Sequence, residues 1–185
     1  MMHPNTLLAD YMALLKQYNE HTNIYSKSSY DKLEFHLQDS INIAAIVSLS
    51  GETVVDLGSG SGLPSAIIAI MNSDQRVIAI ESKERKRRFL HQVKSELALE
   101  NYEVFEGDIQ QFRHQRNDFC GAITAKAFAK APKALQIAKT LNGKKGKLVI
   151  PISDKQLSDL PKAITRFADT QTIDNTEYHY IIHPL

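Results

Sequence analysis

The sequence predicts an α/β fold in which a mostly parallel, seven-stranded sheet carries helices on both faces. Short β-branched apolar runs alternate along the chain with helical patterns, which is typical of right-handed βαβ units. The run 53–57 leads through a glycine-rich loop into an apolar helix, so this loop is expected over the carboxyl end of a parallel strand. The last two short strands have no helix between them, which indicates an antiparallel hairpin at one end of the sheet.

Two amphipathic helices are expected before the first strand. Asn5 can cap the first helix, Ser29 or Asp31 opens the second, and Gly51 ends it. We expect residues 1–50 to form a helical extension that packs on a Rossmann-like core of residues 51–185, near its ligand edge. At 185 residues, the extension and the core are expected to form a single domain.

The core elements follow from apolar periodicity and from the positions of glycine and proline. Helices are expected at 65–71, 83–99 and 130–141, with Pro132 tolerated in the first turn of the third helix. Gly143 and Gly146 stop that helix, and a weaker helical pattern surrounds Pro161. The expected strands are, in chain order, 53–57, 76–80, 102–106, 119–124, 147–152, 170–173 and 177–182.

Composition and charge are those of a soluble globular protein. Hydrophobic residues make up 43% of the chain and charged residues 23%, and no apolar run is long enough to span a membrane. With no signal-peptide pattern and a single cysteine, the core residue Cys120, we expect a cytoplasmic protein. We also expect a monomer, which none of these patterns tests. The net charge is only +1, but residues 83–94 hold six Lys or Arg against one Glu, and residues 126–147 hold seven Lys and no acid. These two basic blocks indicate a positive face.

The glycine-rich loop favours a cationic ligand over a pyrophosphate. Asp56 lies in the strand, and the glycines at 58, 60 and 62 let the backbone bend and approach a ligand closely. A dinucleotide site needs its third glycine three positions after the second, where this chain has Leu63, and the Asp56 carboxylate would repel phosphate. An acid there suits the aminoacyl end of S-adenosylmethionine; a dinucleotide and a turn without ligand are the alternatives. The candidate cofactor-binding residues in this stretch are Asp56, Gly58, Ser59, Gly60 and Gly62.

Two further acids follow the second and third strands. Glu81 lies 19 residues beyond Gly62, where a carboxylate can accept hydrogen bonds from both ribose hydroxyls. Asp108 can accept from an adenine amino group, and the backbone of Ile109 and Gln110 can meet the ring edge. The alternatives are a solvated acid at Glu81 and a helix cap at Asp108.

The candidate substrate residues lie outside the loop. His36 and Asp39 are three positions apart and share a helix face, which either forms a surface hydrogen bond or holds substrate near the cofactor. Lys126, Lys130 and Lys133 follow the fourth strand on the ligand side, where they could contact RNA phosphates or remain solvated. No His or Cys spacing resembles a zinc site and no Ser-His-Asp signature is present, so we expect no metal.

These residues together resemble the glucose-inhibited division protein B family, the bacterial small-subunit rRNA guanine-N7 methyltransferases, of which the chain looks like a divergent member. The resemblance extends from Tyr18 to Ile152. Its most specific parts are the element His36-x-x-Asp39-Ser40-Ile41, the loop Asp56-Leu-Gly-Ser-Gly-Ser-Gly-Leu-Pro64 and the element Lys126-Ala-Phe-Ala129. Further matching stretches are Tyr18-Asn19, Asn23-Ile24, Arg88-Phe-Leu-His-Gln-Val93, Glu96-Leu97 and Leu99-Glu-Asn101.

The resemblance implies a class I methyltransferase fold and methyl transfer from S-adenosylmethionine to N7 of a guanine in 16S rRNA. Guanine N7 has a free lone pair, so such an enzyme needs no general base; it holds N7, the methyl carbon and sulfur in line. The implied partner is ribosomal RNA or the small ribosomal subunit, and Lys126, His36 and Asp39 are the implied catalytic residues. In the family pattern the cofactor-contacting positions include Gly58, Leu63, Ile109, Gln110 and Lys126.

The chain also departs from the family pattern, which keeps other functions open. Lys126 stands where the family usually has Arg, Ser65 replaces a usual fourth glycine, and Ile150-Pro151-Ile152 replaces a Leu-Lys-Gly strand end. The C-terminal end also lacks the usual final basic residues. One alternative is a methyltransferase-like protein with weakened catalysis that binds ribosomal RNA or a partner. Another is a methyltransferase of a different RNA or of a small molecule.

Overall fold

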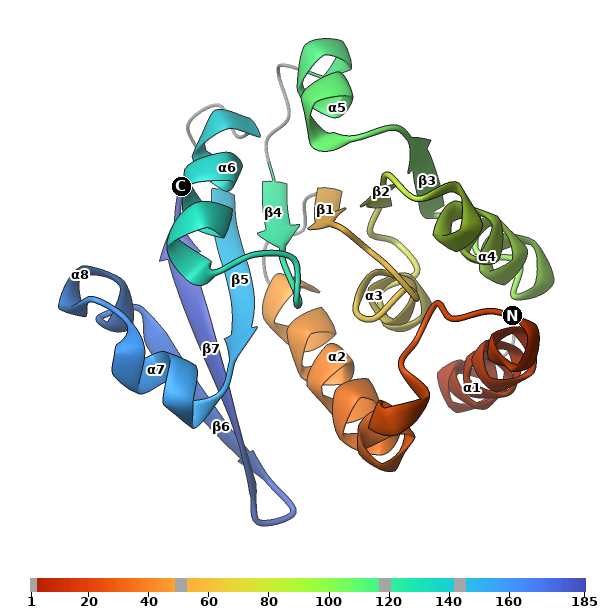
Figure 1. Cartoon of the computed structure of the whole chain (residues 1–185), viewed down its shortest axis with the longest axis horizontal. Coiled ribbons are helices and arrows are strands. Elements are labelled where there is room, and N and C mark those ends of the chain that lie inside the picture. Colours follow the sequence, from red (N-terminus) through yellow and green to blue (C-terminus); the bar gives the residue numbers. More distant parts are fainter. Residues whose placement is uncertain (1–2, 49–52, 117–120, 142–145) are drawn as a thin grey trace.

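The structure, a computed structural model, describes residues 3–48, 53–116, 121–141 and 146–185. Its centre is a seven-stranded sheet with the strand order β3-β2-β1-β4-β5-β7-β6 (Figure 1). The first five strands of the chain run parallel: β1 (Thr53–Leu57), β2 (Val77–Glu81), β3 (Tyr102–Glu106), β4 (Gly121–Thr124) and β5 (Gly146–Ile152). The predicted mostly parallel, seven-stranded sheet is therefore confirmed.

The expected hairpin closes one end of the sheet. Strands β6 (Ala168–Ile173) and β7 (Thr176–Pro184) are antiparallel, and β7 also pairs antiparallel with β5. Asp174 and Asn175 join them with φ angles of 48° and 60°, the backbone that a two-residue hairpin turn requires. The register places Ile152 of β5 opposite His179, so β7 brings side chains to the carboxyl edge of the parallel strands.

Helices cover both faces of the sheet, as predicted. Neighbouring residues of a strand point to opposite faces, so Val54 belongs to one apolar core and Val55 to the other. The first core is covered by α1 (Pro4–His21), α2 (Leu33–Ser48), α3 (Ser65–Met71) and α4 (Glu84–Glu96). The second is covered by α5 (Ile109–Gln115), α6 (Ala131–Leu141), α7 (Asp154–Asp159) and α8 (Lys162–Thr165).

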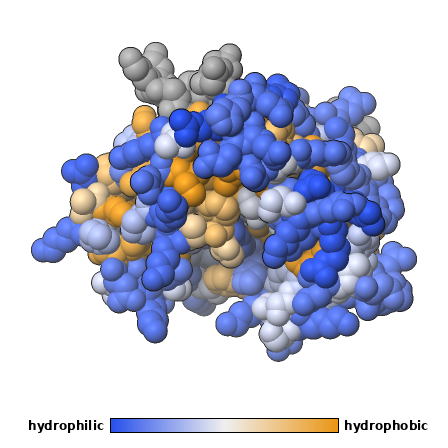
Figure 2. Space-filling view, turned by 45° about the horizontal axis from the view of Figure 1, so that its top comes forward, coloured by the Kyte–Doolittle hydropathy of each residue, from blue (hydrophilic) through white to orange (hydrophobic). Residues whose placement is uncertain are grey.

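The strand order places a crevice above the centre of the sheet. β1 lies between β2 and β4, so the chain passes to one side of β1 first and to the other side later. Ligands of open α/β sheets bind outside the carboxyl ends of the strands at such a point. On the face seen in Figure 2, polar residues surround a central area where apolar side chains come to the surface.

The N-terminal helices differ in detail from the expectation. Helix α1 begins at Pro4 rather than after Asn5, because the side chain of His3 caps it by accepting from the Asn5 backbone N–H at 3.3 Å. Ser29 and Asp31 lie inside a 3₁₀ helix, η1 (Lys27–Lys32), and α2 follows directly at Leu33. In α1, the hydroxyl of Tyr11 donates to the carbonyl of Ser61 at 2.8 Å, so this helix holds the glycine loop.

The loop after β4 is the other segment that positions the site. Helix α6 was expected to begin at residue 130 and begins at Ala131. Residues 125–130 therefore form a connection at the carboxyl edge of the sheet. The expectations for Gly51, Cys120 and Gly143 fall outside the described residues. Across the described ranges, no helix is both long and apolar enough to cross a membrane.

Candidate cofactor and substrate site

The glycine loop requires glycine at its first position. Gly58, Gly60 and Gly62 all have positive φ, of 70°, 60° and 91°. A Cβ on Gly58 would lie 2.7 Å from Cδ2 of Phe128, whereas a Cβ on Gly60 would meet nothing closer than 3.6 Å. The amides of Gly58 and Ser59 both donate to the carbonyl of Ile80, at 2.9 and 3.0 Å. The loop therefore folds over the end of β2 with Phe128 against it.

Asp56 places a buried, partly unsatisfied carboxylate below this loop. Its Oδ1 accepts from the Thr124 hydroxyl at 2.6 Å, and its Oδ2 has no hydrogen-bond partner among the described residues. Burial raises the pKa of this carboxyl, while Thr124 and the hydroxyls of Ser59 and Ser65 lower it in part. A buried carboxylate oxygen without a partner is costly, so this position favours a ligand that brings a positive charge or a donor.

Glu81 supports the loop from the neighbouring strand. It is buried at the end of β2, where Oε2 accepts from the Gly60 amide at 3.0 Å and Oε1 from the Lys83 amide at 2.8 Å. The alternative that Glu81 is a solvated acid at the end of the strand is therefore excluded. A carboxylate oxygen can accept more than one hydrogen bond, so these contacts leave capacity for a ligand hydroxyl.

A cavity of about 300 Å³ opens beside the loop and between the ends of β2 and β3. Asp108 lines it and also caps α5, because its side chain accepts from the Gln111 amide and the Gln111 side chain accepts from the Asp108 amide. The two sequence interpretations of Asp108, cap and ligand contact, are thus compatible. The lining residues are Gly58, Ile80, Ser82, Asp108, Ile109, Gln110, Arg113, Phe128, Ile137 and Thr140.

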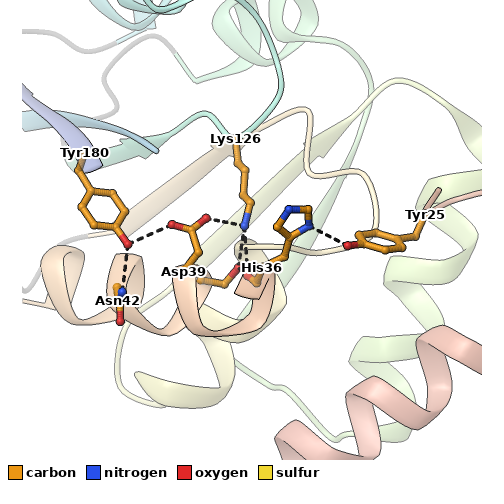
Figure 3. A network of polar contacts seen from close by, with 7 residues as sticks. Tyr25, His36, Asp39, Asn42, Lys126 and Tyr180 are labelled. Carbon is orange, nitrogen blue, oxygen red and sulfur yellow. Dashed lines mark hydrogen bonds and ion pairs between the residues drawn. The ribbon is translucent and has the colours of Figure 1, made fainter. Parts of the chain in front are cut away.

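The other predicted residues form a polar network about Lys126 (Figure 3). The Lys126 ammonium lies 2.6 Å from Asp39 Oδ2 and donates to the His36 carbonyl at 3.1 Å. Asp39 Oδ1 accepts from the Tyr180 hydroxyl at 3.0 Å, and Nδ1 of His36 lies 2.7 Å from the Tyr25 hydroxyl. Side chains from α2, the loop after β4, and β7 therefore meet, although they are far apart in the sequence.

Burial shapes the charges of this network. The side chains of Lys126 and Asp39 are 13% and 6% exposed. Burial lowers the pKa of Lys126, and the charge and hydrogen bond of Asp39 oppose that shift. Burial, followed by the charge of Lys126, lowers the pKa of His36. The ion pair lets two charges remain buried at the carboxyl edge of the sheet.

A second cavity, of about 420 Å³, lies on the other side of the loop after β4. Lys126 and Ala127 line it, whereas the next residue, Phe128, lines the first cavity. Ala127 has a φ of 52°, so the backbone takes a left-handed turn where the two cavities divide. The second cavity is lined by Phe35, His36, Asp39, Lys126, Ala127, Pro151, Ile152, Ser153, Asp154, Gln156, Glu177, Tyr178 and His179.

Several of these residues were missed from the sequence. Phe128 belongs to the Lys126–Ala129 element, but no local pattern indicates that its ring packs on Gly58. Asp154, Glu177 and His179 place possible metal-ligand atoms within 4.8 Å of one another, although their spacing in the sequence does not resemble a zinc site. Asp154 and Glu177 are exposed, and both can pair with a protonated His179.

In the first basic block, residues 83–94, Arg85 and Arg87 donate to backbone carbonyls and Arg88 pairs with Glu84.

The strand order, the glycine loop and the acid in β1 define a Rossmann-like methyltransferase fold. Solved structures of two O-methyltransferases are among those that share it. The O-methyltransferase from Bacillus cereus, solved in complex with SAH, matches with a TM-score of 0.66 at 13% identity, over 97% of this chain and 90% of that one. A predicted O-methyltransferase from Agrobacterium tumefaciens matches with a TM-score of 0.61 at 14% identity, over 79% and 80%.

The family model described as GidB, rRNA small subunit methyltransferase G, matches residues 4–176, so the chain belongs to this family. The curated ribosomal RNA small subunit methyltransferase G of Shewanella loihica is 31% identical over 162 residues, which are 85% of this chain and 76% of the relative. That of Brachyspira hyodysenteriae is 33% identical over 77% of this chain and 68% of the relative. The matched parts cover 47% of the Fusobacterium nucleatum relative and 57% of the Stutzerimonas stutzeri one, about half their length.

Proposed function

We propose that this protein transfers a methyl group from S-adenosylmethionine to N7 of a guanine in 16S rRNA. The observation that carries the proposal is the buried Asp56 Oδ2, which has no partner among the described residues and lies under a loop with three positive-φ glycines. A positively charged ligand would supply what this oxygen lacks. Membership of the rRNA small subunit methyltransferase G family supports the same cofactor and the same substrate class.

The residues present fit S-adenosylmethionine. We assign its charged aminoacyl end to Asp56 and to the loop residues Gly58, Ser59, Gly60, Gly62 and Leu63. Glu81 would accept from the ribose hydroxyls, and the cavity lined by Asp108, Ile109 and Gln110 would hold the adenine. When bound, the cofactor supplies an electrophilic methyl group on a sulfonium sulfur.

The chain's own residues would position the acceptor base. Guanine N7 is a lone-pair acceptor, so no side chain has to remove a proton before transfer. We assign the second cavity, with Lys126, His36 and Asp39 in its wall, to the substrate. Methylation leaves a positive charge on the base. The Asp39 carboxylate would stabilise this charge, and its ion pair with Lys126 would set how strongly it does so. Lys126 would also adjoin the cofactor.

The substrate would be ribosomal RNA or the small ribosomal subunit, bound by the protein as a cytoplasmic monomer. Exposed lysines such as Lys130 and Lys133 at the start of α6 would contact phosphates without reading sequence. We assign residues 1–50 and 51–185 to one domain, because Tyr11 holds the glycine loop and α2 contributes to the Lys126 network.

Transfer of tritium from labelled S-adenosylmethionine to undermethylated small subunits tests the proposal. We expect label in 16S rRNA, recovered as 7-methylguanosine, with the wild-type protein and much less with Asp56→Asn. Cofactor binding without transfer to any ribosomal substrate would instead identify a methyltransferase-like binding protein. Activity that does not fall as salt rises would indicate a small neutral substrate.

A further inference from the structure

Phe35 exposes an aromatic ring at the second cavity. It is 43% exposed, and among the described residues Met71 is the other large hydrophobic residue with comparable exposure, at 37%. Phe35 lies on α2 directly before His36 and lines the cavity together with Lys126 and Tyr178. A single exposed apolar side chain is ordinary on a protein surface, so it is the position of Phe35 in the wall of this cavity that points to a ligand.

The ring of Phe35 is held in place from behind. Its centroid lies 4.8 Å from that of Tyr178 on β7, and the two planes are 15° apart, so the rings are stacked. The ring of His36 meets it edge-on at 5.8 Å. Tyr178 itself is buried. Because one partner is buried and the other exposed, the pair presents a flat, preorganised surface to a ligand.

The charges around this ring favour a base rather than a phosphate. Asp154 and Glu177 line the same cavity, and their side chains are 88% and 65% exposed. One oxygen of each lies near Nε2 of His179, at 2.5 and 3.8 Å, and Lys126 in the same wall is paired with Asp39. The exposed carboxylates therefore keep capacity to accept hydrogen bonds and would repel a phosphate. Carboxylates accept hydrogen bonds and cannot donate them. Among the four RNA bases, guanine alone carries two adjacent donors, N1–H and the N2 amino group, on its pairing edge. N7 lies on the other side of the ring.

We propose that Phe35, backed by Tyr178, is the stacking platform for the methyl-accepting guanine, whose pairing edge faces Asp154 and Glu177. The inference rests on the proposed function, since it names how the substrate base is held. Unpaired bases of RNA are commonly bound by stacking on aromatic side chains and by hydrogen bonds to their edges. Loss of such a stack weakens binding by about 5- to 150-fold.

The test is RNA binding by the S-adenosylhomocysteine complex, which needs no methyl transfer. The probe is a single-stranded 9-mer with one central guanosine, compared with strands that carry adenosine or an abasic site there. Wild type should bind the guanosine strand the most tightly. Phe35→Ala and Phe35→Leu should lower that affinity at least 5-fold, to that of the abasic strand, whose own affinity should not change. Phe35→Trp should retain the preference.

Met71→Ala is the matched control, because it removes a large apolar side chain of similar exposure and should change nothing. Thermal unfolding and cofactor affinity of each variant exclude loss of fold. Equal affinity of Phe35→Ala and wild type, full binding by Phe35→Leu, or equal binding of the adenosine strand would overturn the inference. A defect of the Phe35 variants that is seen only with assembled subunits would also overturn it, because it would indicate that Phe35 contacts a ribosomal protein. Wild-type methylation of rRNA separates all these outcomes from failure of the proposed function.

Discussion

The Lys126 ammonium and the Asp39 carboxylate form a nearly buried ion pair, 2.6 Å apart, between the loop after β4 and helix α2. The two residues are 87 positions apart in the sequence, and the pair fixes α2 against the carboxyl edge of the sheet. Removing one partner should cost more stability than the intact pair contributes, because it leaves the other residue charged and buried.

We therefore predict that Lys126→Ala and Asp39→Ala each lower the free energy of unfolding by about 3–5 kcal/mol. The double variant Lys126→Ala/Asp39→Ala should lose less than the sum of the two single losses, because it leaves neither charge alone. Urea unfolding monitored by circular dichroism measures this. Arg88→Ala, which breaks an exposed pair with Glu84, is the control and should have little effect. Strictly additive losses would contradict the coupling.

The buried charge of Asp56 should lower the stability of the ligand-free protein but raise its affinity for the cofactor. Burial raises its pKa above that of an ordinary aspartate, so the folded protein binds a proton at Asp56 more tightly than the unfolded chain does. Stability from this group should therefore rise as the pH falls through its folded-state pKa. Asp56→Asn, which removes the buried charge, should stabilise the ligand-free protein at neutral pH. Differential scanning calorimetry at several pH values measures the pH dependence of stability and the change caused by Asp56→Asn.

Affinity for S-adenosylmethionine should fall as the pH drops through the same pKa, because a protonated Asp56 no longer attracts a cation. We expect Asp56→Asn to weaken binding about 10- to 100-fold at neutral pH, the loss of one charge-assisted hydrogen bond. The variant should also flatten this part of the pH profile. Titration calorimetry over a series of pH values from neutral downward measures this; an unchanged affinity in the variant would remove Asp56 from the site.

Gly58 and Gly60 provide a matched pair of glycine substitutions. Both have a φ near 60–70°, so replacement by alanine costs each about 1–2 kcal/mol of backbone strain. Only at Gly58 would the new Cβ press on the ring of Phe128, at 2.7 Å. We predict that Gly58→Ala is the more destabilising of the two in thermal unfolding. Combining it with Phe128→Ala should recover part of the difference. Equal losses at both positions would refute the contact.

The local pattern around β1 predicted its structure well. The run of β-branched residues, the alternating glycines and the apolar helix that follows are all encoded within about twenty consecutive residues, so periodicity and backbone propensity suffice. The same holds for the final hairpin, whose Asp174-Asn175 turn lies between two short strands. The start of α1 was predicted two residues too late, because His3, rather than Asn5, provides the cap.

The candidate site could be predicted only in part, because its contacts are long-range. The sequence pointed to Asp39 and Lys126 separately, but no spacing rule joins residues 87 positions apart. The stack of Phe35 on Tyr178 and the packing of Phe128 on Gly58 also depend on the assembled sheet. Asp108 shows the limit of motif reasoning, since one side chain both caps a helix and lines a cavity.

Mass mapping of 16S rRNA nucleosides in cells that lack this protein tests the central claim most directly. The account predicts that one 7-methylguanosine disappears from 16S rRNA, that the wild-type gene restores it, and that the Asp56→Asn variant does not. An unchanged complement of 7-methylguanosine in cells without the protein would contradict it.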